Sequence, residues 1–367
     1  MNVLEHINVQ FVECLYVVTL GLTLYSVFTQ TVYLYVACIT GLYICLKVVR
    51  KKTTGGVAVK NKGVFITGCD TGFGHDVARR FDDLGFIVFA GCLKPEGEGA
   101  RKLKSASSKS LHVVALDVRS DESLELAHEY VKKHLPSGGL WAIVNNAGLN
   151  IMGDVELLTI DLYRKCMDIN FSGAVRTLRR FLYLVRESKG RVAIVTSVKG
   201  RYSWPANSAY HVTKHGLETL ADCLRLEMRK FEVGVAVVEP GNFSNATACQ
   251  NEEVFKRYEE ELNEIWAAAS PDVKVTYGRK YVDAYLAQQR ASTSGGGLTT
   301  RPVVDALEDA VVSTRPHTRY MVDGGWFDPY AILARFYDYL PTCLSDLIIR
   351  KMTGCDRWPD YKKPKLE

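Results

Sequence analysis

Short apolar segments alternate with amphipathic segments between residues 64 and 238 of this chain. The apolar segments are about five residues long, as buried strands are, and lie at residues 64–67, 86–90, 111–116, 141–145, 192–197 and 235–238. Between them, apolar residues recur at helical spacing, for example at residues 74–84, 121–135 and 161–187. This alternation predicts an α/β fold with a doubly wound parallel sheet and helices on both faces.

The N-terminal region departs from this alternation. Residues 14–46 contain no Lys, Arg, Asp or Glu, and a helix of roughly 20 apolar residues is enough to cross a bilayer. We therefore predict a transmembrane anchor within residues 1–49, as one long helix or as two short helices that break at residues 29–31. No Lys or Arg precedes the segment, which disfavours a cleaved signal; a buried hairpin of a soluble protein is the alternative.

A basic linker at residues 50–62 follows the anchor, and the positive-inside rule places it on the cytoplasmic side. We assign residues 63–325 to a catalytic domain that faces the cytosol. Within it, the helix-rich residues 251–298 are a candidate substrate lid, with a plain surface excursion as the alternative. Residues 326–367 form an aromatic segment and a polar tail; this segment either packs on the domain or dips into the bilayer interface.

Composition narrows the functional classes. Charged residues make up 24% of the chain and the net charge of +5 comes from scattered basic residues, so no nucleic-acid surface is predicted. The 10 cysteines include no CxxC pair and the histidines do not cluster, so neither a metal site nor a disulfide framework is predicted. Reduced thiols are typical of the cytosol or the mitochondrial matrix.

A glycine-rich turn follows the first predicted strand and opens the first predicted helix. Gly68, Gly72 and Gly74 allow a tight turn and let a pyrophosphate approach the amides of the helix N-terminus, with Thr71 and Phe73 in the same turn. The strand before the turn and the helix after it make this context specific. It predicts a Rossmann-type dinucleotide site.

Asn145, Ala147 and Gly148 stand at the carboxyl end of the fourth predicted strand. In an open α/β sheet, ligands bind outside the carboxyl ends of the strands. This segment is therefore expected to border the dinucleotide.

Ser197, Tyr210 and Lys214 have the spacing of a catalytic group. Tyr210 and Lys214 are four residues apart and share one face of a helix. A phenol with an ordinary pKa near ~10 is a poor base at neutral pH, and a lysine ammonium beside it favours the phenolate. Ser197 ends a predicted strand, where its hydroxyl can bond to a substrate oxygen. Together they predict hydride-transfer chemistry on an alcohol.

These motifs resemble those of the short-chain dehydrogenase/reductase family over about residues 60–350. Within it, the chain is most similar to the branch of D-β-hydroxybutyrate dehydrogenase, 17β-hydroxysteroid dehydrogenase type 2 and retinol dehydrogenases. The motifs that carry this resemblance lie at residues 67–74, 89–93, 140–148 and 238–243. Residues 277–281 and 315–320 look most like hydroxybutyrate dehydrogenase, whereas the apolar N-terminus and residues 359–363 look more like the hydroxysteroid enzyme.

The resemblance implies a role for each catalytic residue. Tyr210 would be the acid/base, Ser197 would polarise the carbinol or carbonyl oxygen, and Lys214 would hold the nicotinamide ribose and lower the pKa of Tyr210. Asn170 would order a water in the proton relay. Asn170 is also the first residue of an N-glycosylation pattern, as are Asn242 and Asn245. Because a glycan at any of these positions would block the cleft, we interpret all three patterns as accidental.

The resemblance also implies cofactor contacts. Asp117 would bond to adenine, and Pro240, Gly241 and Thr247 would face the nicotinamide. NAD is the expected cofactor, with NADP as an alternative, because residues 92–94 lack the acid that often holds the ribose hydroxyls, and Lys94 could attract a 2′-phosphate.

The predicted function is therefore NAD(P)-dependent hydride transfer between the cofactor and an alcohol or ketone. A lipophilic hydroxysteroid- or retinol-type substrate is favoured by the membrane anchor. Interconversion of 3-hydroxybutyrate and acetoacetate is the alternative, which needs a cation that the sequence does not assign among Lys199, Arg201 and His211. An inactive dinucleotide-binding membrane scaffold is a third hypothesis.

The expected partners are the small-molecule substrate and the lipid bilayer, with a homo-oligomer as an open alternative. The expected location is the endoplasmic reticulum membrane, or else a mitochondrial membrane.

Overall fold

The computed structural model describes part of the N-terminal region and almost all of the remainder, namely residues 16–23, 25, 35–36, 38–42, 44–45, 55–247, 252–293 and 296–354. Most of the predicted anchor, residues 1–49, lies outside these residues, as does the tail from residue 355. Within the described part of the chain, no helix combines the length and the apolar character that a membrane crossing requires.

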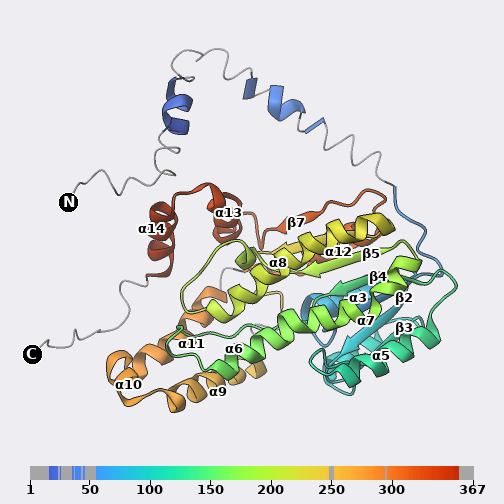
Figure 1. The fold of residues 1–367 in the computed structure, drawn as a ribbon, viewed down its shortest axis with the longest axis horizontal. Coiled ribbons are helices and arrows are strands. Elements are labelled where there is room, and N and C mark those ends of the chain that lie inside the picture. Colours follow the sequence, from blue (N-terminus) through green and yellow to red (C-terminus); the bar gives the residue numbers. More distant parts are fainter. Residues whose placement is uncertain are drawn as a thin grey trace, which may run out of the picture.

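A seven-stranded sheet forms the centre of the molecule, with the strand order β3-β2-β1-β4-β5-β6-β7. All neighbouring strands pair in parallel (Figure 1). The strands are β1 (Gly63–Thr67), β2 (Ile87–Cys92), β3 (Leu111–Ala115), β4 (Leu140–Asn145), β5 (Arg191–Val195), β6 (Gly234–Pro240) and β7 (Arg319–Val322). The predicted parallel α/β sheet is confirmed, and β7 is an additional strand at its edge.

Helices cover both faces of the sheet because alternate strand residues point in opposite directions. Val64 and Ile66 join the apolar cluster of one face, and Phe65 joins that of the other, where it stacks on Phe181 at a ring-centroid distance of 4.2 Å. The first face carries α3 (Gly72–Asp83), α4 (Glu98–Ser105) and α12 (Arg301–Val312), and the second carries α5 (Asp121–His134), α7 (Gly173–Glu187) and α8 (Ser208–Met228). Figure 1 shows α7 and α8 running across the second face.

The long helical segment predicted at residues 161–187 is interrupted. It consists of α6 (Ile160–Met167), a π-helical turn at Asp168–Ser172 and α7. The turn contains Asn170, which is fully buried and bonds to the backbone of Leu149. Single π-turns inside α-helices are frequent at functional sites.

The predicted lid region forms three helices, α9 (Glu252–Ala268), α10 (Pro271–Tyr277) and α11 (Arg279–Thr293), at the end of the molecule beside α6 (Figure 1). Leu262 and Ile265 of α9 pack with Leu162 of α6 and Ala209 of α8 in one buried cluster. Helix α9 of the predicted lid region therefore packs against the start of α8.

The C-terminal segment packs on the domain through α13 (Pro329–Phe336) and α14 (Thr342–Thr353). Ala331 and Ile349 share a buried cluster with Val198 and Tyr202 of the loop after β5. The segment also exposes large apolar side chains, including Trp326, Phe327, Phe336, Tyr339, Leu344 and Leu347.

Candidate active site

Five of the predicted site residues lie at the carboxyl ends of parallel strands, which share one edge of the sheet. Gly68 follows β1, Asp117 follows β3 and Asn145 ends β4, while Ser197 follows β5 and Pro240 ends β6. Because each strand of this set pairs in parallel with its neighbour, residues that are far apart in sequence meet at this edge.

The glycine-rich turn has the backbone that only glycine adopts without strain. Gly68 has a φ of +72° and Gly72 a φ of +65°. A Cβ on Gly74 would lie 2.2 Å from the carbonyl oxygen of Gly68, so the turn closes tightly onto the start of α3. The first turn of α3 carries no acidic residue, and the side chain of its N-cap, Thr71, makes no capping hydrogen bond. The N-terminal amides of this helix can therefore bind an anion.

The segment after β4 is hydrogen-bonded to the glycine-rich turn. The hydroxyl of Thr67 accepts hydrogen bonds from the backbone amides of Asn146 and Ala147, at 3.0 Å each. The side-chain amide of Asn146 donates to the carbonyl oxygens of Thr67 and Gly68. Beside them, the buried side chain of Asn145 has no hydrogen-bond partner among the described residues. Its amide can therefore serve a bound ligand.

Ser197 lies two residues beyond the end of β5 in an extended conformation and caps the short turn at Val198–Gly200. Its Oγ accepts a hydrogen bond from the backbone amide of Lys199 at 3.2 Å and donates a long one of 3.4 Å to the carbonyl oxygen of Pro240. The loose bond to Pro240 leaves the hydroxyl able to donate to a substrate oxygen instead.

Tyr210 and Lys214 lie one turn apart near the start of α8. The Nζ of Lys214 is 5.5 Å from the ring centroid of Tyr210 and donates to the carbonyl oxygen of Val195 at 3.0 Å. Burial lowers the pKa of Lys214 to about 8. Tyr210 is half-buried against the cluster of lid and α6 side chains. A phenol, a buried ammonium and the end of β5 therefore form one group.

Asn170 connects this group to the segment after β4. Its Oδ1 accepts from the amide of Leu149 at 2.8 Å, and its Nδ2 donates to the carbonyl oxygen of Leu149 and to Thr213 Oγ1. A Cβ on Gly148 would lie 3.3 Å from Asn170 Oδ1 and 3.6 Å from Lys214 Nζ. The absence of a side chain at Gly148 therefore keeps this space open.

The segment after β6 approaches the glycine-rich turn. Thr247 lies against Gly72, where an added Cβ would be 3.8 Å from Thr247 Cβ, and Phe73 packs edge-on against Phe243 at 5.6 Å. Gly241 is in contact with Asp328, which accepts from the amide of Asn242 and was not predicted as part of the site. Asp328 ties the C-terminal segment to this loop.

Two acidic side chains, those of Asp117 and Asp70, lie near the carboxyl ends of β3 and β2. Their contacts differ from those expected from the sequence. Asp117 accepts three hydrogen bonds from the side chain of Arg119 and one from its amide, and that guanidinium lowers the pKa of Asp117. Asp70, which the sequence did not single out, accepts from the backbone amides of Leu93 and Lys94 at 2.9 Å each. An acid therefore reaches the end of β2 from the glycine-rich turn.

A glycine-rich turn, a buried lysine beside a tyrosine and a serine beyond the fifth strand are thus assembled on one sheet edge. The family model described as "short chain dehydrogenase" matches residues 62–256, which include all these positions. The chain belongs to the short-chain dehydrogenase family. Membership confirms the predicted enzyme class, an oxidoreductase that uses a nicotinamide dinucleotide.

This short-chain dehydrogenase has similar relatives of several specificities. It is 40% identical to the mitochondrial D-beta-hydroxybutyrate dehydrogenase of Bos taurus over 79% of this chain and 84% of that protein. It is 35% identical to 17-beta-hydroxysteroid dehydrogenase type 6 of Bos taurus, over 89% of this chain and 98% of that protein. It is 37% identical to retinol dehydrogenase 16 of Homo sapiens, over 86% of this chain and 96% of that protein. The predicted branch is confirmed.

The fold of the short-chain dehydrogenase also matches solved structures. A short chain dehydrogenase/reductase from Burkholderia phymatum in complex with NAD aligns with a TM-score of 0.60 and 19% identity, over 77% of this chain and 93% of that one. This likeness supports the fold.

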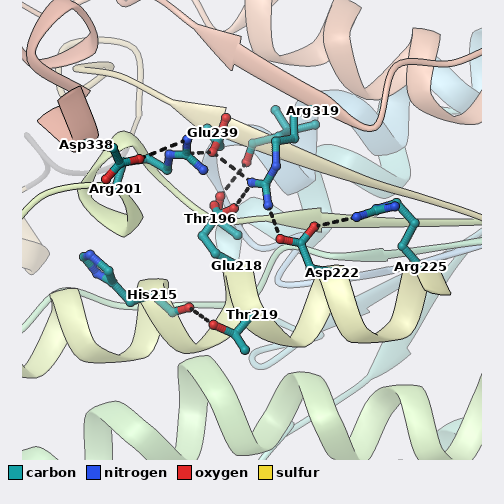
Figure 2. Close-up of polar contacts among 11 residues, drawn as sticks. Thr196, Arg201, His215, Glu218, Thr219, Asp222, Arg225, Glu239, Arg319 and Asp338 are labelled. Carbon is teal, nitrogen blue, oxygen red and sulfur yellow. Dashed lines mark hydrogen bonds and ion pairs between the residues drawn. The ribbon is translucent and has the colours of Figure 1, made fainter. Parts of the chain in front are cut away.

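A network of charged side chains lies beside α8 of this short-chain dehydrogenase (Figure 2). Glu218, one turn beyond Lys214, is bonded to Arg319 of β7, whose guanidinium also contacts Glu239 of β6 and Asp222 of α8. Figure 2 shows Arg319 between these three carboxylates. The network joins α8, β6 and β7 around one guanidinium.

Glu239 connects this network to the loop that carries Ser197. Its side chain is 2% exposed and lies 3.8 Å from Arg201, which also pairs with Asp338. Burial, together with the nearby Glu218 carboxylate, raises the pKa of Glu239 to about 7.

The three cations considered for a substrate carboxylate differ in their surroundings. Arg201 is directed into the network around Glu239, and burial lowers the pKa of His211 to about 3, which leaves that imidazole neutral. Lys199, by contrast, places its Nζ 5.8 Å from the ring centroid of Tyr210 and donates to Asn207 at 3.0 Å. Of the three, Lys199 is the cation that lies beside Tyr210.

Proposed function

We propose that the chain oxidises a lipophilic alcohol of the hydroxysteroid or retinol type with NAD, and catalyses the reverse reduction. The placement of the Lys214 ammonium 5.5 Å from the ring of Tyr210 carries the proposal. Tyr210 takes the hydroxyl proton, because the neighbouring cation favours its phenolate. Ser197 donates a hydrogen bond to the same substrate oxygen. When bound, NAD supplies the hydride acceptor.

The residues around the glycine-rich turn fit a dinucleotide. The positive φ values of Gly68 and Gly72 and the uncapped start of α3 suit a pyrophosphate. The unpartnered side-chain amide of Asn145 offers both a donor and an acceptor to a ribose. Lys214 and Gly148 would border the nicotinamide ribose, with Asn170 ordering a water behind them.

Three features support a lipophilic substrate. Tyr210 packs against the apolar cluster that the lid helices form with α6. The C-terminal segment exposes several large apolar side chains, including Trp326 and Phe327. Relatives named for hydroxysteroids and retinol align over 96–98% of their own length.

A 3-hydroxy carboxylic acid is the second candidate substrate. It is favoured by the position of the Lys199 ammonium beside Tyr210 and by the identity of 40% to a hydroxybutyrate dehydrogenase. In 3-hydroxybutyrate the carboxylate lies two carbons from the carbinol, so a cation near the phenol is the group that would recognise it.

We also propose that residues 1–49 anchor the enzyme in a membrane, with the catalytic domain on the cytosolic side and the endoplasmic reticulum as the location. The absence of charge in residues 14–46 supports the anchor. Resistance of the full chain to carbonate extraction, and its digestion by protease added outside sealed microsomes, are the expected results. Protection of the domain would contradict the orientation.

A substrate panel tests the function. Detergent-solubilised full chain is given NAD or NADP with estradiol, retinol or 3-hydroxybutyrate, and absorbance of the reduced cofactor is recorded. We expect turnover of estradiol or retinol. A strong rate with 3-hydroxybutyrate alone, lost in Lys199→Met, would establish the second candidate. Binding of NADH without turnover of any alcohol would instead favour the inactive scaffold.

A further inference from the structure

Asp70 stands in the middle of the glycine-rich turn, and its carboxylate reaches across to the neighbouring strand. Oδ2 accepts from the backbone amide of Leu93, and Oδ1 accepts from that of Lys94, each at 2.9 Å. The backbone of the turn also lies against the start of α4, which follows β2. A Cβ added to Gly99 of α4 would lie 1.9 Å from the carbonyl oxygen of Asp70. The turn after β1 and the segment after β2 are therefore packed together around this carboxylate.

The end of β2 is where dinucleotide folds of this kind distinguish NAD from NADP. An acid there bonds to the ribose 2′-hydroxyl of NAD, whereas a nearby cation accommodates the 2′-phosphate of NADP. In this chain the residues after β2 are Leu93 and Lys94, with no acid. β2 pairs with β1 from Gly63↔Ile87 to Thr67↔Gly91, so the residues just beyond Thr67 can reach the same position.

Asp70 supplies the missing charge from the adjacent strand. Its carboxylate also occupies two backbone amides that point out of the strand end, the type of donor that binds phosphate. The charge acts locally: burial and the Asp70 carboxylate together raise the pKa of the Cys92 thiol to about 12. The side chain of Lys94 is exposed, where water screens its attraction for a phosphate more strongly.

We propose that Asp70 is the specificity-determining residue that makes this enzyme prefer NAD over NADP. The inference rests on the proposed dinucleotide site. The carboxylate repels a 2′-phosphate and holds the amides that would otherwise bind it. A ribose 2′-hydroxyl, which is neutral and can donate a hydrogen bond, is accepted beside the same carboxylate.

Asp70→Asn tests this inference in the detergent-solubilised full chain. The amide side chain keeps the size of the carboxylate and one acceptor oxygen but removes the charge. We expect the ratio of kcat/KM for NAD to that for NADP to fall at least about tenfold, mainly through a gain with NADP. Fluorescence titration should show tighter binding of NADPH and little change for NADH.

Asp83→Asn is the matched control, because it removes the same charge from the exposed C-terminal end of α3 and should leave the ratio unchanged. Asp70→Ser is the second variant, should Asp70→Asn fold poorly by circular dichroism. The serine hydroxyl can accept a hydrogen bond from one of the two backbone amides. Asp70→Ser should therefore also lower the ratio of kcat/KM for NAD to that for NADP.

Two results would overturn the inference. One is an unchanged ratio in folded variants of Asp70; the other is an equal loss of NADH and NADPH binding, which would make Asp70 a brace for the turn alone. A wild-type chain that binds neither nucleotide would refute the proposed function as well, so the two failures are distinguishable.

Discussion

The Nζ of Lys214 donates a hydrogen bond of 3.0 Å to the carbonyl oxygen of Val195, which joins α8 to the last residue of β5. Ser197 stands two residues beyond that carbonyl. One bond therefore fixes both the ammonium beside Tyr210 and the strand end that leads to the serine. The same bond keeps a cation in a site that is only 4% exposed, which burial disfavours.

Replacement of Lys214 by Met should therefore raise stability while it destroys activity. The pKa of Lys214 is lowered from 10.5 to about 8, so holding the charged form in the buried site reduces the free energy of unfolding at every pH below about 8. Met carries no charge, so the variant gains at most about 3 kcal/mol in the free energy of unfolding. Loss of the hydrogen bond to Val195 makes this gain smaller. The difference in Tm between variant and wild type should shrink as the pH rises from 8 toward 10.5.

Thermal unfolding at pH 7, 8, 9 and 10 checks this expectation. Lys132→Met, on the exposed side of α5, is the control and should show no such dependence on pH. A Lys214→Met variant that is less stable than wild type by a constant amount at all four pH values would contradict the buried-cation interpretation.

Tyr210→Phe should abolish turnover without affecting the cofactor site. General acid/base catalysis by a positioned side chain contributes about 10²- to 10⁴-fold, so kcat should fall by that factor. Binding of NADH, measured by fluorescence, should stay within about twofold because the glycine-rich turn is untouched. Tyr130→Phe, on α5, is the matched control and should keep full activity. Unchanged turnover in Tyr210→Phe would refute its role as the acid/base.

Gly74→Ala should disrupt the dinucleotide turn. Its Cβ would lie 2.2 Å from the carbonyl oxygen of Gly68 and 2.5 Å from the side-chain amide of Asn146, both of which hold the turn to the segment after β4. Overpacking of this kind costs about 1–3 kcal/mol, and NADH affinity should fall by about tenfold or more. Gly325→Ala meets nothing within 4 Å and should be silent. Wild-type NADH affinity in Gly74→Ala would show that the turn tolerates the methyl group.

The sheet was predictable from the sequence to the extent that its strands are buried on both faces. β1 is fully buried and appears as a continuous apolar segment, whereas β7 is a half-buried edge strand that begins with Arg319 and gave no such signal. The π-turn at Asp168–Ser172 was also missed, because the apolar spacing continues across it.

The candidate site was predictable where its chemistry is local in sequence. Tyr210 and Lys214 are four residues apart, and the glycines of the turn all lie within residues 68–74. Asp70 was overlooked as a charge near the ribose because the expected position for an acid lies after β2, more than twenty residues downstream. Contacts such as that between Glu239 and Arg319, 80 residues apart, depend on strand order, which the apolar pattern does not specify.

Glu239→Gln should change how stability depends on pH. The raised pKa of about 7 means that the folded protein keeps the Glu239 proton between pH 4.5 and 7, whereas the unfolded chain loses it there. The stability that the protonated group contributes is therefore complete below pH 4.5 and is lost as the pH rises through 7. Glutamine has no proton to lose, and its oxygen can still accept from Arg319.

The Tm of Glu239→Gln relative to wild type should therefore rise from pH 5 to pH 7 and level off near pH 8. The full effect is at most about 3 kcal/mol, and Arg319 and Arg201 reduce it by stabilising the carboxylate. Glu227→Gln, exposed on α8, is the control and should give a constant difference. A constant difference for Glu239→Gln as well would mean that Arg319 and Arg201 keep Glu239 ionised throughout this range, contrary to the raised pKa.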